Sequence, residues 1–91
     1  MTAPPRESAI EKNVCDYARQ AGWLVHPKAG PNNRGWPDRT FTKPGILLFV
    51  EFKAPGKKPT RLQSHTHEKL KAKGYTVHVV DSVEDGRALF A

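Results

Sequence analysis

Apolar residues recur at two different spacings along this chain, and the change of spacing marks the expected elements. Between residues 7 and 21 they return every three or four positions, which predicts an amphipathic helix that ends at Gly22. Residues 46–53, with the sequence ILLFVEFK, are the most hydrophobic stretch and predict a central strand. Similar patterns predict strands at 23–26, 38–42 and 75–80 and helices at 60–73 and 83–90. The order α-β-β-β-α-β-α predicts an α/β fold in which helices pack on a mixed sheet.

The same patterns predict which side chains are buried. One face of the central strand is wholly apolar and should face the core, with residues Ile46, Leu48, Val50 and Phe52. The opposite face turns from apolar to charged at Glu51 and Lys53. The helix at 60–73 is weakly amphipathic, and its expected inward positions are Leu62, His65 or Thr66, Leu70 and Lys73.

Lys43-Pro44-Gly45 separates the second and third strands and predicts a hairpin turn. Asp38 and Glu51 are equally distant from the centre of this turn. Regular antiparallel pairing would set them opposite each other, with their side-chain stems about 5 Å apart. Two carboxylates in that position repel each other unless a cation lies between them, and Mg²⁺ or Mn²⁺ prefers such oxygen ligands. A regular hairpin therefore predicts a metal site, whereas a bulge would remove it.

Glu51 and Lys53 project from the same side of the central strand. A metal-holding carboxylate beside an ammonium suits phosphodiester hydrolysis, because the metal activates water and the lysine orients it or adds positive charge. Taken alone, the pair is also compatible with an exposed ion pair that contributes little. The segment Gly35-Trp36-Pro37-Asp38 favours the chemical interpretation, because G-x-P-D, a hairpin and E-x-K together are much rarer than any one of them.

These motifs carry a resemblance to a known family. Gly35-Trp36-Pro37-Asp38, Glu51-Phe52-Lys53 and Gln63 resemble the hallmark residues of the PD-(D/E)XK nucleases, specifically the VRR-NUC (virus-type replication-repair nuclease) branch. The resemblance runs from about Glu7 to Val83, and the basic loop 53–59 is similar to that of stand-alone phage members. It implies a restriction-endonuclease-like core, with residues 7–91 forming a single nuclease domain after a flexible arm at residues 1–6.

The resemblance also implies roles for the site residues. Asp38 and Glu51 would bind Mg²⁺ or Mn²⁺, with the backbone carbonyl of Phe52 as a third ligand. Lys53 would be the catalytic lysine. The reaction would be in-line attack of water on the phosphorus, leaving a 5′-phosphate.

Two further site residues are implied, each with a competing interpretation. An acid on the first helix would hold water in the outer shell of the metal, and Glu11, on the inward stripe of the helix, is favoured over Glu7. Gln63 would position the catalytic lysine or a phosphate. Alternatively, capping boxes that begin at Ser8 and Thr60 would use Glu11 and Gln63 only to satisfy backbone N–H groups, and the two roles could coexist.

The charge of the chain favours an anionic partner. Fifteen Lys and Arg stand against nine Asp and Glu, giving a formal charge of +6, and nucleic acid is the first candidate. The cations of the loops that border the proposed site are expected to contact phosphates, and a tryptophan to stack on a base or ribose. These DNA-contact candidates are Lys28, Arg34, Trp36, Arg39, Lys57, Lys58 and Arg61. Solvated loop charges and a packed tryptophan are the alternatives.

Other residues narrow the class of protein. The single cysteine, Cys15, excludes an internal disulfide and a cysteine-based zinc site, and we expect it in the core of a protein from a reducing compartment. The chain shows no apolar leader and no run of about 18 apolar residues, so we expect a cytoplasmic protein of a bacterial or phage-infected cell. His65 and His67 are two positions apart on a helix and do not share a face, which argues against a pair of histidine ligands.

Together these observations predict a metal-dependent DNA endonuclease. The resemblance to stand-alone family members implies a homodimer that cleaves Holliday junctions or other branched DNA, because one centre cuts one strand and a two-fold dimer presents two centres. The alternative is a basic DNA-binding module that is non-catalytic or depends on a partner protein. That alternative leaves two carboxylates at a surface facing DNA, where they would repel phosphate.

Overall fold

The computed structural model describes residues 3–91 and confirms the predicted order of elements. Along the chain these are α1 (Glu7–Gln20), β1 (Leu24–Val25), β2 (Arg39–Lys43), β3 (Ile46–Phe52), α2 (Arg61–Ala72), β4 (Thr76–Val80) and α3 (Val83–Ala88). Of the arm expected at residues 1–6, residues 1 and 2 lie outside the described part of the chain. Residues 3–6 are exposed and precede α1.

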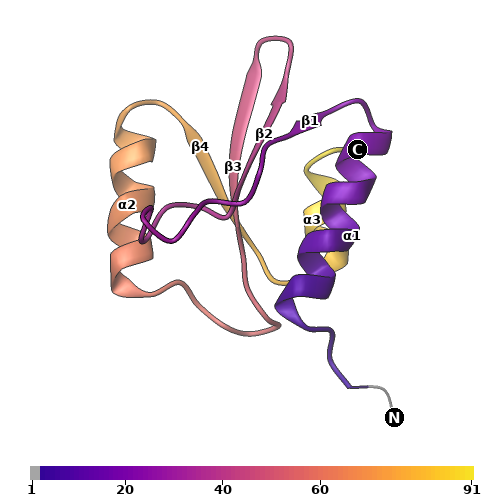
Figure 1. Ribbon diagram of the computed structural model, residues 1–91, viewed down its shortest axis with the longest axis horizontal. Helices are drawn as coiled ribbons and strands as arrows, with labels where there is room; N and C mark the ends of the chain where they lie inside the picture. The colour runs from indigo at the N-terminus through magenta and orange to yellow at the C-terminus, as the bar shows by residue number, and fades with distance from the viewer. Residues whose placement is uncertain (1–2) are drawn as a thin grey trace.

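The strands form one four-stranded mixed sheet in the order β1-β2-β3-β4. β1 pairs antiparallel with β2 and β2 with β3, whereas β3 and β4 are parallel and are joined through α2. Figure 1 shows α2 on one side of the sheet and α1 with α3 on the other. The α/β class predicted from the sequence is therefore correct, with the sheet as the middle of three layers.

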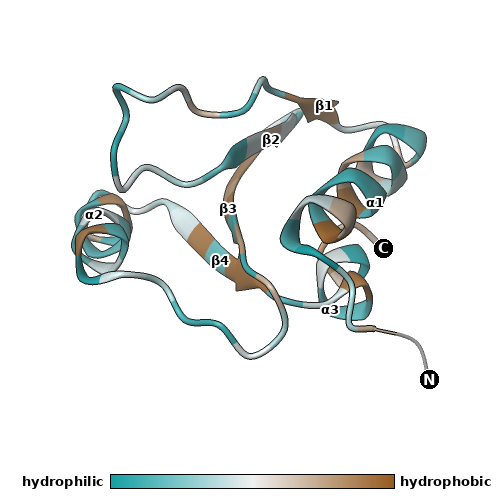
Figure 2. Ribbon diagram, turned by 60° about the horizontal axis from the view of Figure 1, so that its bottom comes forward, coloured by the Kyte–Doolittle hydropathy of each residue, from teal (hydrophilic) through white to brown (hydrophobic). Residues whose placement is uncertain are grey.

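The main core lies between the sheet and the two helices α1 and α3. It contains Ile10, Val14, Cys15 and Ala18 of α1, Phe41 of β2, Val50 and Phe52 of β3, Val80 of β4, and Phe90. In Figure 2 the hydrophobic residues of α1 and α3 lie accordingly on the side that faces the sheet, and the hydrophilic ones on the outer side. Ile46 departs from the prediction: its side chain is 46% exposed, because the β2–β3 turn extends past the layer of helices (Figure 1).

The inward face of α2 also differs from the prediction. Its buried side chains are His67 and Leu70, while Leu62 is 48% exposed. The inward positions are Gln63, Thr66, His67 and Leu70, with Gln63 and Thr66 half-buried. Leu70 and Thr66 therefore lie inward as predicted, whereas Leu62, His65 and Lys73 are exposed. Two polar side chains that the prediction left out, Gln63 and His67, point into the protein instead.

Gly35 brings the loop before β2 against the first turns of α2. Its φ is +79°, and a Cβ atom at this position would lie 2.8 Å from Leu62 Cγ and 2.9 Å from Thr66 Oγ1. Only glycine fits both this backbone conformation and this close approach. The glycine of the G-x-P-D motif therefore sets the distance between the loop that carries Asp38 and the helix that carries Gln63.

None of the three helices in residues 3–91 could cross a membrane. The longest, α1, has 14 residues, whereas a spanning helix needs about 20 apolar ones. Cys15 lies on the buried side of α1 with 1% of its surface exposed, as expected. Burial raises the pKa of its thiol, so the residue behaves as part of the core.

Candidate active site

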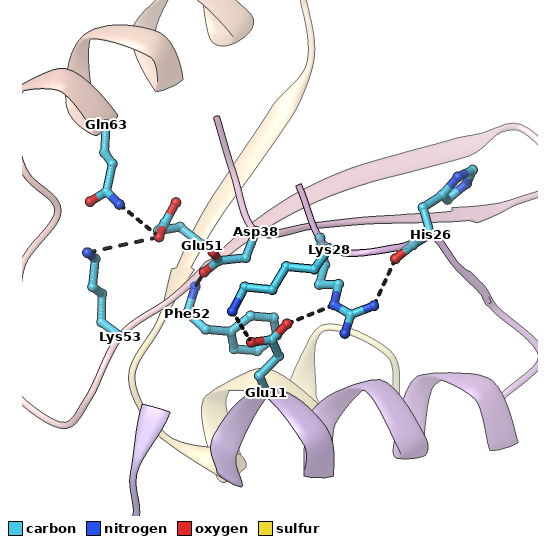
Figure 3. Close-up of polar contacts among 9 residues, drawn as sticks. Glu11, His26, Lys28, Asp38, Glu51, Phe52, Lys53 and Gln63 are labelled. Atoms are coloured by element: carbon cyan, nitrogen blue, oxygen red, sulfur yellow. Dashed lines mark hydrogen bonds and ion pairs between the residues drawn. The ribbon is translucent and has the colours of Figure 1, made fainter. Parts of the chain in front are cut away.

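The hairpin register brings Asp38 and Glu51 together. Arg39 pairs with Val50 and Lys43 with Ile46, with no bulge between them, so the next opposed pair is Asp38 and Glu51. The Asp38 carboxylate Oδ2 accepts a hydrogen bond from the backbone N–H of Phe52 at 2.8 Å. This bond fixes the carboxylate beside the end of β3, where Glu51 lies (Figure 3).

Glu51 is a buried carboxylate, with only 1% of its surface exposed. Burial, and after it the negative charge of Asp38 and a hydrogen bond with that residue, raise the pKa of Glu51 from 4.5 to about 8. Its Oε2 atom lies 3.9 Å from the ammonium nitrogen of Lys53, and its Oε1 atom has no hydrogen-bond partner within residues 3–91. The alternative of an exposed Glu–Lys pair at a strand end is thereby excluded.

Gln63 forms the predicted helix cap and also contacts Glu51, whereas the expectation was that it would position Lys53 or a phosphate. Its backbone N–H donates to the Thr60 hydroxyl at 3.2 Å, and its side-chain Oε1 accepts from the Thr60 N–H at 2.9 Å, which forms a capping box. Its Nε2 group donates to Glu51 Oε2 at 3.2 Å. The cap fixes one end of the amide and thereby aims the other end at the carboxylate.

His67 is a site residue that the sequence argument did not find. It is 4% exposed, and its Nε2 atom lies 3.5 Å from Glu51 Oε1. Burial, with Lys71 and Lys53 adding to it, lowers the pKa of His67, which favours the neutral ring. The signal was present: His67 follows Gln63 by four positions and shares its face of α2. In the sequence, His67 was considered only together with His65, as a possible pair of metal ligands.

Glu11 lies on the buried side of α1, as its spacing predicted, and is 5% exposed. Its Oε1 accepts from Lys28 Nζ at 3.1 Å and its Oε2 from Arg39 Nε at 2.7 Å (Figure 3). The capping box at Ser8 does not form, because α1 begins two residues earlier than that box requires and its N-cap, Arg6, makes no side-chain cap bond.

The DNA-contact candidates fall into two groups. Arg34, Lys57, Lys58 and Arg61 are exposed. Lys28 and Arg39 instead form ion pairs with Glu11, and Arg39 also donates to the backbone carbonyl of His26 at 3.0 Å. Arg39 was expected in a loop that borders the site, but it belongs to β2, and only 21% of its side chain is exposed. Trp36 packs edge-on against Phe49, with ring centroids 5.7 Å apart, yet remains 41% exposed.

The comparisons with known proteins agree with this architecture. No protein-family model matches the chain. The chain is 44% identical over 78 residues to "Putative nuclease p44" of Acyrthosiphon pisum secondary endosymbiont phage 1, which covers 85% of this chain and 84% of that protein. A solved "VRR_NUC domain" structure superposes with a TM-score of 0.81 at 29% identity, over 91% of each chain. A "VRR_NUC domain protein" has a TM-score of 0.79 over 96% of this chain and 86% of the other, and at 16% identity it shows a common fold alone.

The chain belongs to the VRR-NUC family. Its coarse class is therefore that of a nuclease, as the sequence motifs predicted. The G-x-P-D and E-x-K motifs of this VRR-NUC domain converge at the Asp38–Glu51 pair, and the downstream Gln63 contacts that pair from α2.

The donor atoms of this VRR-NUC site fit a hard divalent cation. Two carboxylates face each other, and one buried oxygen, Glu51 Oε1, has no partner. In an extended strand the N–H and C=O of a residue point the same way, so the Phe52 carbonyl faces the side where its N–H meets Asp38. Within residues 3–91 no three His, Cys, Asp or Glu side chains gather around one point. That suits Mg²⁺, which binds through one or two carboxylates and keeps several waters.

Proposed function

We propose that this protein is a metal-dependent DNA endonuclease that hydrolyses phosphodiester bonds with Mg²⁺ or Mn²⁺. The observation that carries the proposal is the state of Glu51, a carboxylate that is 1% exposed, lies against Asp38 and has its nearest lysine nitrogen at 3.9 Å. Burying such a group without full compensation costs stability. A divalent cation between the two carboxylates would supply the missing positive charge.

The chemistry follows from what surrounds this pair. A bound divalent ion would lower the pKa of a water and offset the charge of the scissile phosphate. Lys53 lies on the same side of the strand as Glu51, and its side chain is only 13% exposed. Its ammonium is available to orient the attacking water or to stabilise charge on the phosphate. Gln63 restrains Glu51 Oε2, and the Phe52 N–H restrains Asp38.

The helix acid that would hold water around the ion is either Glu11 or Glu7. Glu11 lies on the inward face, but both of its oxygens accept from cations. Glu7, one turn earlier, is half-buried and its charge contributes to the raised pKa of Glu51. Comparing Mn²⁺ affinity in Glu7→Gln and Glu11→Gln tests the choice, since the acid in the outer shell is the one whose loss weakens binding.

DNA is the substrate that the surface favours. The formal charge is +6, and Arg34, Lys57, Lys58 and Arg61 are exposed on the two loops and the helix start next to the site. These cations would contact phosphates, and the exposed face of Trp36 is available for a base or ribose. The name of the phage relative, a nuclease, agrees with this substrate class.

We further propose a homodimer that cleaves Holliday junctions or other branched DNA. One centre cuts one strand, so paired cuts need two centres related by symmetry. The end of the hairpin and the neighbouring edge strand leave three apolar side chains exposed: Leu24 at 63%, Ile46 at 46% and Leu47 at 37%. A second copy that covers them would remove apolar surface from water.

The test is cleavage of a labelled four-way junction, a flap and a linear duplex in Mg²⁺, Mn²⁺ or EDTA. Asp38→Ala and Lys53→Ala serve as inactive controls, and light scattering reports the mass in solution. We expect symmetric nicks in the junction that need metal and are lost in both variants, together with the mass of a dimer. Binding without cleavage in either metal would favour the non-catalytic or partner-dependent DNA-binding module.

A further inference from the structure

Two buried polar atoms face each other in the contact between β3 and α2. Glu51 Oε1 and His67 Nε2 are 3.5 Å apart, and neither has a hydrogen-bond partner among the described residues. Buried polar groups in proteins are nearly always hydrogen-bonded, and an unsatisfied one destabilises the fold. Because N–H···O bonds close at about 2.7–3.2 Å, a shift of a few tenths of an ångström would join these two atoms.

We propose that His67 is a positioning residue that holds Glu51 for the metal ion, an inference that rests on the proposed function. With its proton on Nε2, the neutral ring donates to Glu51 Oε1, while Gln63 donates to Oε2 at 3.2 Å. Both donors come from α2, four residues apart on the same face. The carboxylate is thereby fixed at both oxygens, and each oxygen keeps a lone pair for the ion.

A neutral donor suits this task better than a lysine or arginine would. A cation in the place of His67 would offset the charge of Glu51 and weaken its hold on a metal. Glu11 illustrates that case, because two cations meet its oxygens at 3.1 and 2.7 Å. His67 is also only 4% exposed, so DNA does not reach it, and it belongs to no group of three possible ligands within residues 3–91. Its effect must pass through Glu51.

Three substitutions separate the donor from the bulk of the ring. His67→Gln keeps an N–H near the place of Nε2, His67→Asn carries its amide one bond too short, and His67→Leu removes the donor. The measurement is Mn²⁺ binding without DNA, followed by the electron paramagnetic resonance signal of free Mn²⁺. We expect His67→Leu and His67→Asn to weaken binding about 10–100-fold, as loss of a ligand's supporting hydrogen bond does. His67→Gln should bind Mn²⁺ within a few-fold of the wild type.

Cleavage of DNA gives the second readout. The Mn²⁺ concentration for half-maximal activity should rise in His67→Leu, while kcat at saturating Mn²⁺ stays near that of the wild type. A merely structural role would instead lower the active fraction at every Mn²⁺ concentration. If His67→Leu does not fold, comparing Mn²⁺ binding by His67→Gln and His67→Asn tests the role of the N–H, because both variants keep a polar side chain.

The outcomes distinguish this inference from the proposed function. If the wild type binds Mn²⁺ and cleaves DNA while His67→Leu binds Mn²⁺ equally well, the role of His67 is refuted and the function stands. If His67→Gln is as weak as His67→Leu, the N–H is not what matters and the inference again fails. If the wild type neither binds Mn²⁺ nor cleaves DNA, the proposed function fails and the role of His67 fails with it.

Discussion

Two glutamates are buried at the candidate active site, and the protein meets their charges differently. Glu11 is 5% exposed, and its two oxygens accept from Lys28 at 3.1 Å and from Arg39 at 2.7 Å. Glu51 is 1% exposed, lies against a second carboxylate and has its nearest lysine nitrogen at 3.9 Å. A buried charge is stable only where something pairs with it. The protein supplies the pairing at Glu11 and leaves it incomplete at Glu51.

The difference sets a carboxylate that pairs with cations of the fold apart from one that, under the proposed function, is left for a metal ion. Glu11 joins α1 to β2 and to the loop at residue 28, so its ion pairs hold the elements around the site together. Glu51 accepts from one neutral donor, Gln63, and its pKa is raised to about 8, chiefly by burial and by Asp38. Exposure alone would not distinguish the two, since both are buried. The partners within hydrogen-bond distance distinguish the two glutamates.

The largest expected effect is on catalysis. Glu51→Gln removes the charge of the ligand and keeps its shape, so we expect cleavage to fall by about a thousand-fold or more, as the loss of several kcal/mol of metal-assisted stabilisation implies. Glu11→Gln should lower the rate far less at a temperature where it is folded. Single-turnover cleavage in saturating Mn²⁺ measures both. Equal losses in the two variants would break the distinction between them.

For the free energy of unfolding the order should be reversed, so that Glu11 matters more than Glu51. Glu11→Ala removes the carboxylate from Lys28 and from the mostly buried Arg39, which keeps only its bond to the His26 carbonyl, and we expect a loss of about 2 kcal/mol in the free energy of unfolding. Asp16→Ala is the matched control, because Asp16 also pairs with two cations on α1 but is 45% exposed. Its loss should cost clearly less stability than that of Glu11, because exposed ion pairs contribute little. Urea denaturation compares them, and similar losses would mean that the Glu11 pairs contribute no more than surface ones.

Without metal, Glu51 should destabilise the protein as the pH rises. Its pKa is raised from 4.5 to about 8, so the folded state holds a proton that the unfolded state releases above about pH 4.5. The wild type therefore loses stability between about pH 5 and 8, and Glu51→Gln does not. His67, whose pKa is lowered, acts with the opposite sign but is present in both proteins.

Thermal melts in EDTA test this expectation. Glu51→Gln should match the wild type near pH 5 and exceed it at pH 8, by about 2 kcal/mol or some 10 °C in a domain of this size. Added Mn²⁺ should raise the Tm of the wild type and not that of the variant. If Glu51→Gln gains no stability over the wild type between pH 5 and 8 in EDTA, the assigned state of Glu51 is contradicted.

The sequence was sufficient for the element order and for the Asp38–Glu51 pair, because both follow from regular geometry. The turn between Lys43 and Ile46 is symmetric and the ladder has no bulge, so distance from the turn predicts the facing residues. The capping box of Gln63 was likewise readable from its spacing to Thr60. Local rules succeed where no tertiary contact overrides them.

The face of α2 could not be predicted in this way. Hydrophobicity places Leu62 inside, yet the inward side chains next to the site are Gln63 and His67, and Leu62 is 48% exposed. A site that holds a carboxylate needs polar donors in the interior, which reverses the pattern used to find a core. The partners of Glu11 were also beyond reach, because Lys28 and Arg39 meet it only through the tertiary fold.

The smallest expected effect tests whether the Glu11 region is purely structural. Lys28 pairs with Glu11 but its side chain is 52% exposed. Its pKa is raised chiefly by the hydrogen bond with Glu11 and also by the charge of Asp38, so it lies where a phosphate near the site would pass. We expect Lys28→Ala to reduce the slope of log affinity against log salt by about one, the change for one lost phosphate contact. Stability should change by less than about 1 kcal/mol, because Arg39 still holds Glu11.

Lys12→Ala is the control for Lys28→Ala. Lys12 also pairs with a carboxylate, Asp16, at 2.8 Å, but its side chain is 79% exposed and bonds to the next turn of its own helix. Its loss should leave the salt slope unchanged in fluorescence anisotropy titrations with junction DNA in EDTA. An unchanged slope for Lys28→Ala as well would mean that Lys28 serves Glu11 alone. A reduced slope would mean that DNA shares this cation with Glu11, so that the ion pair which joins the loop to α1 loosens when substrate arrives.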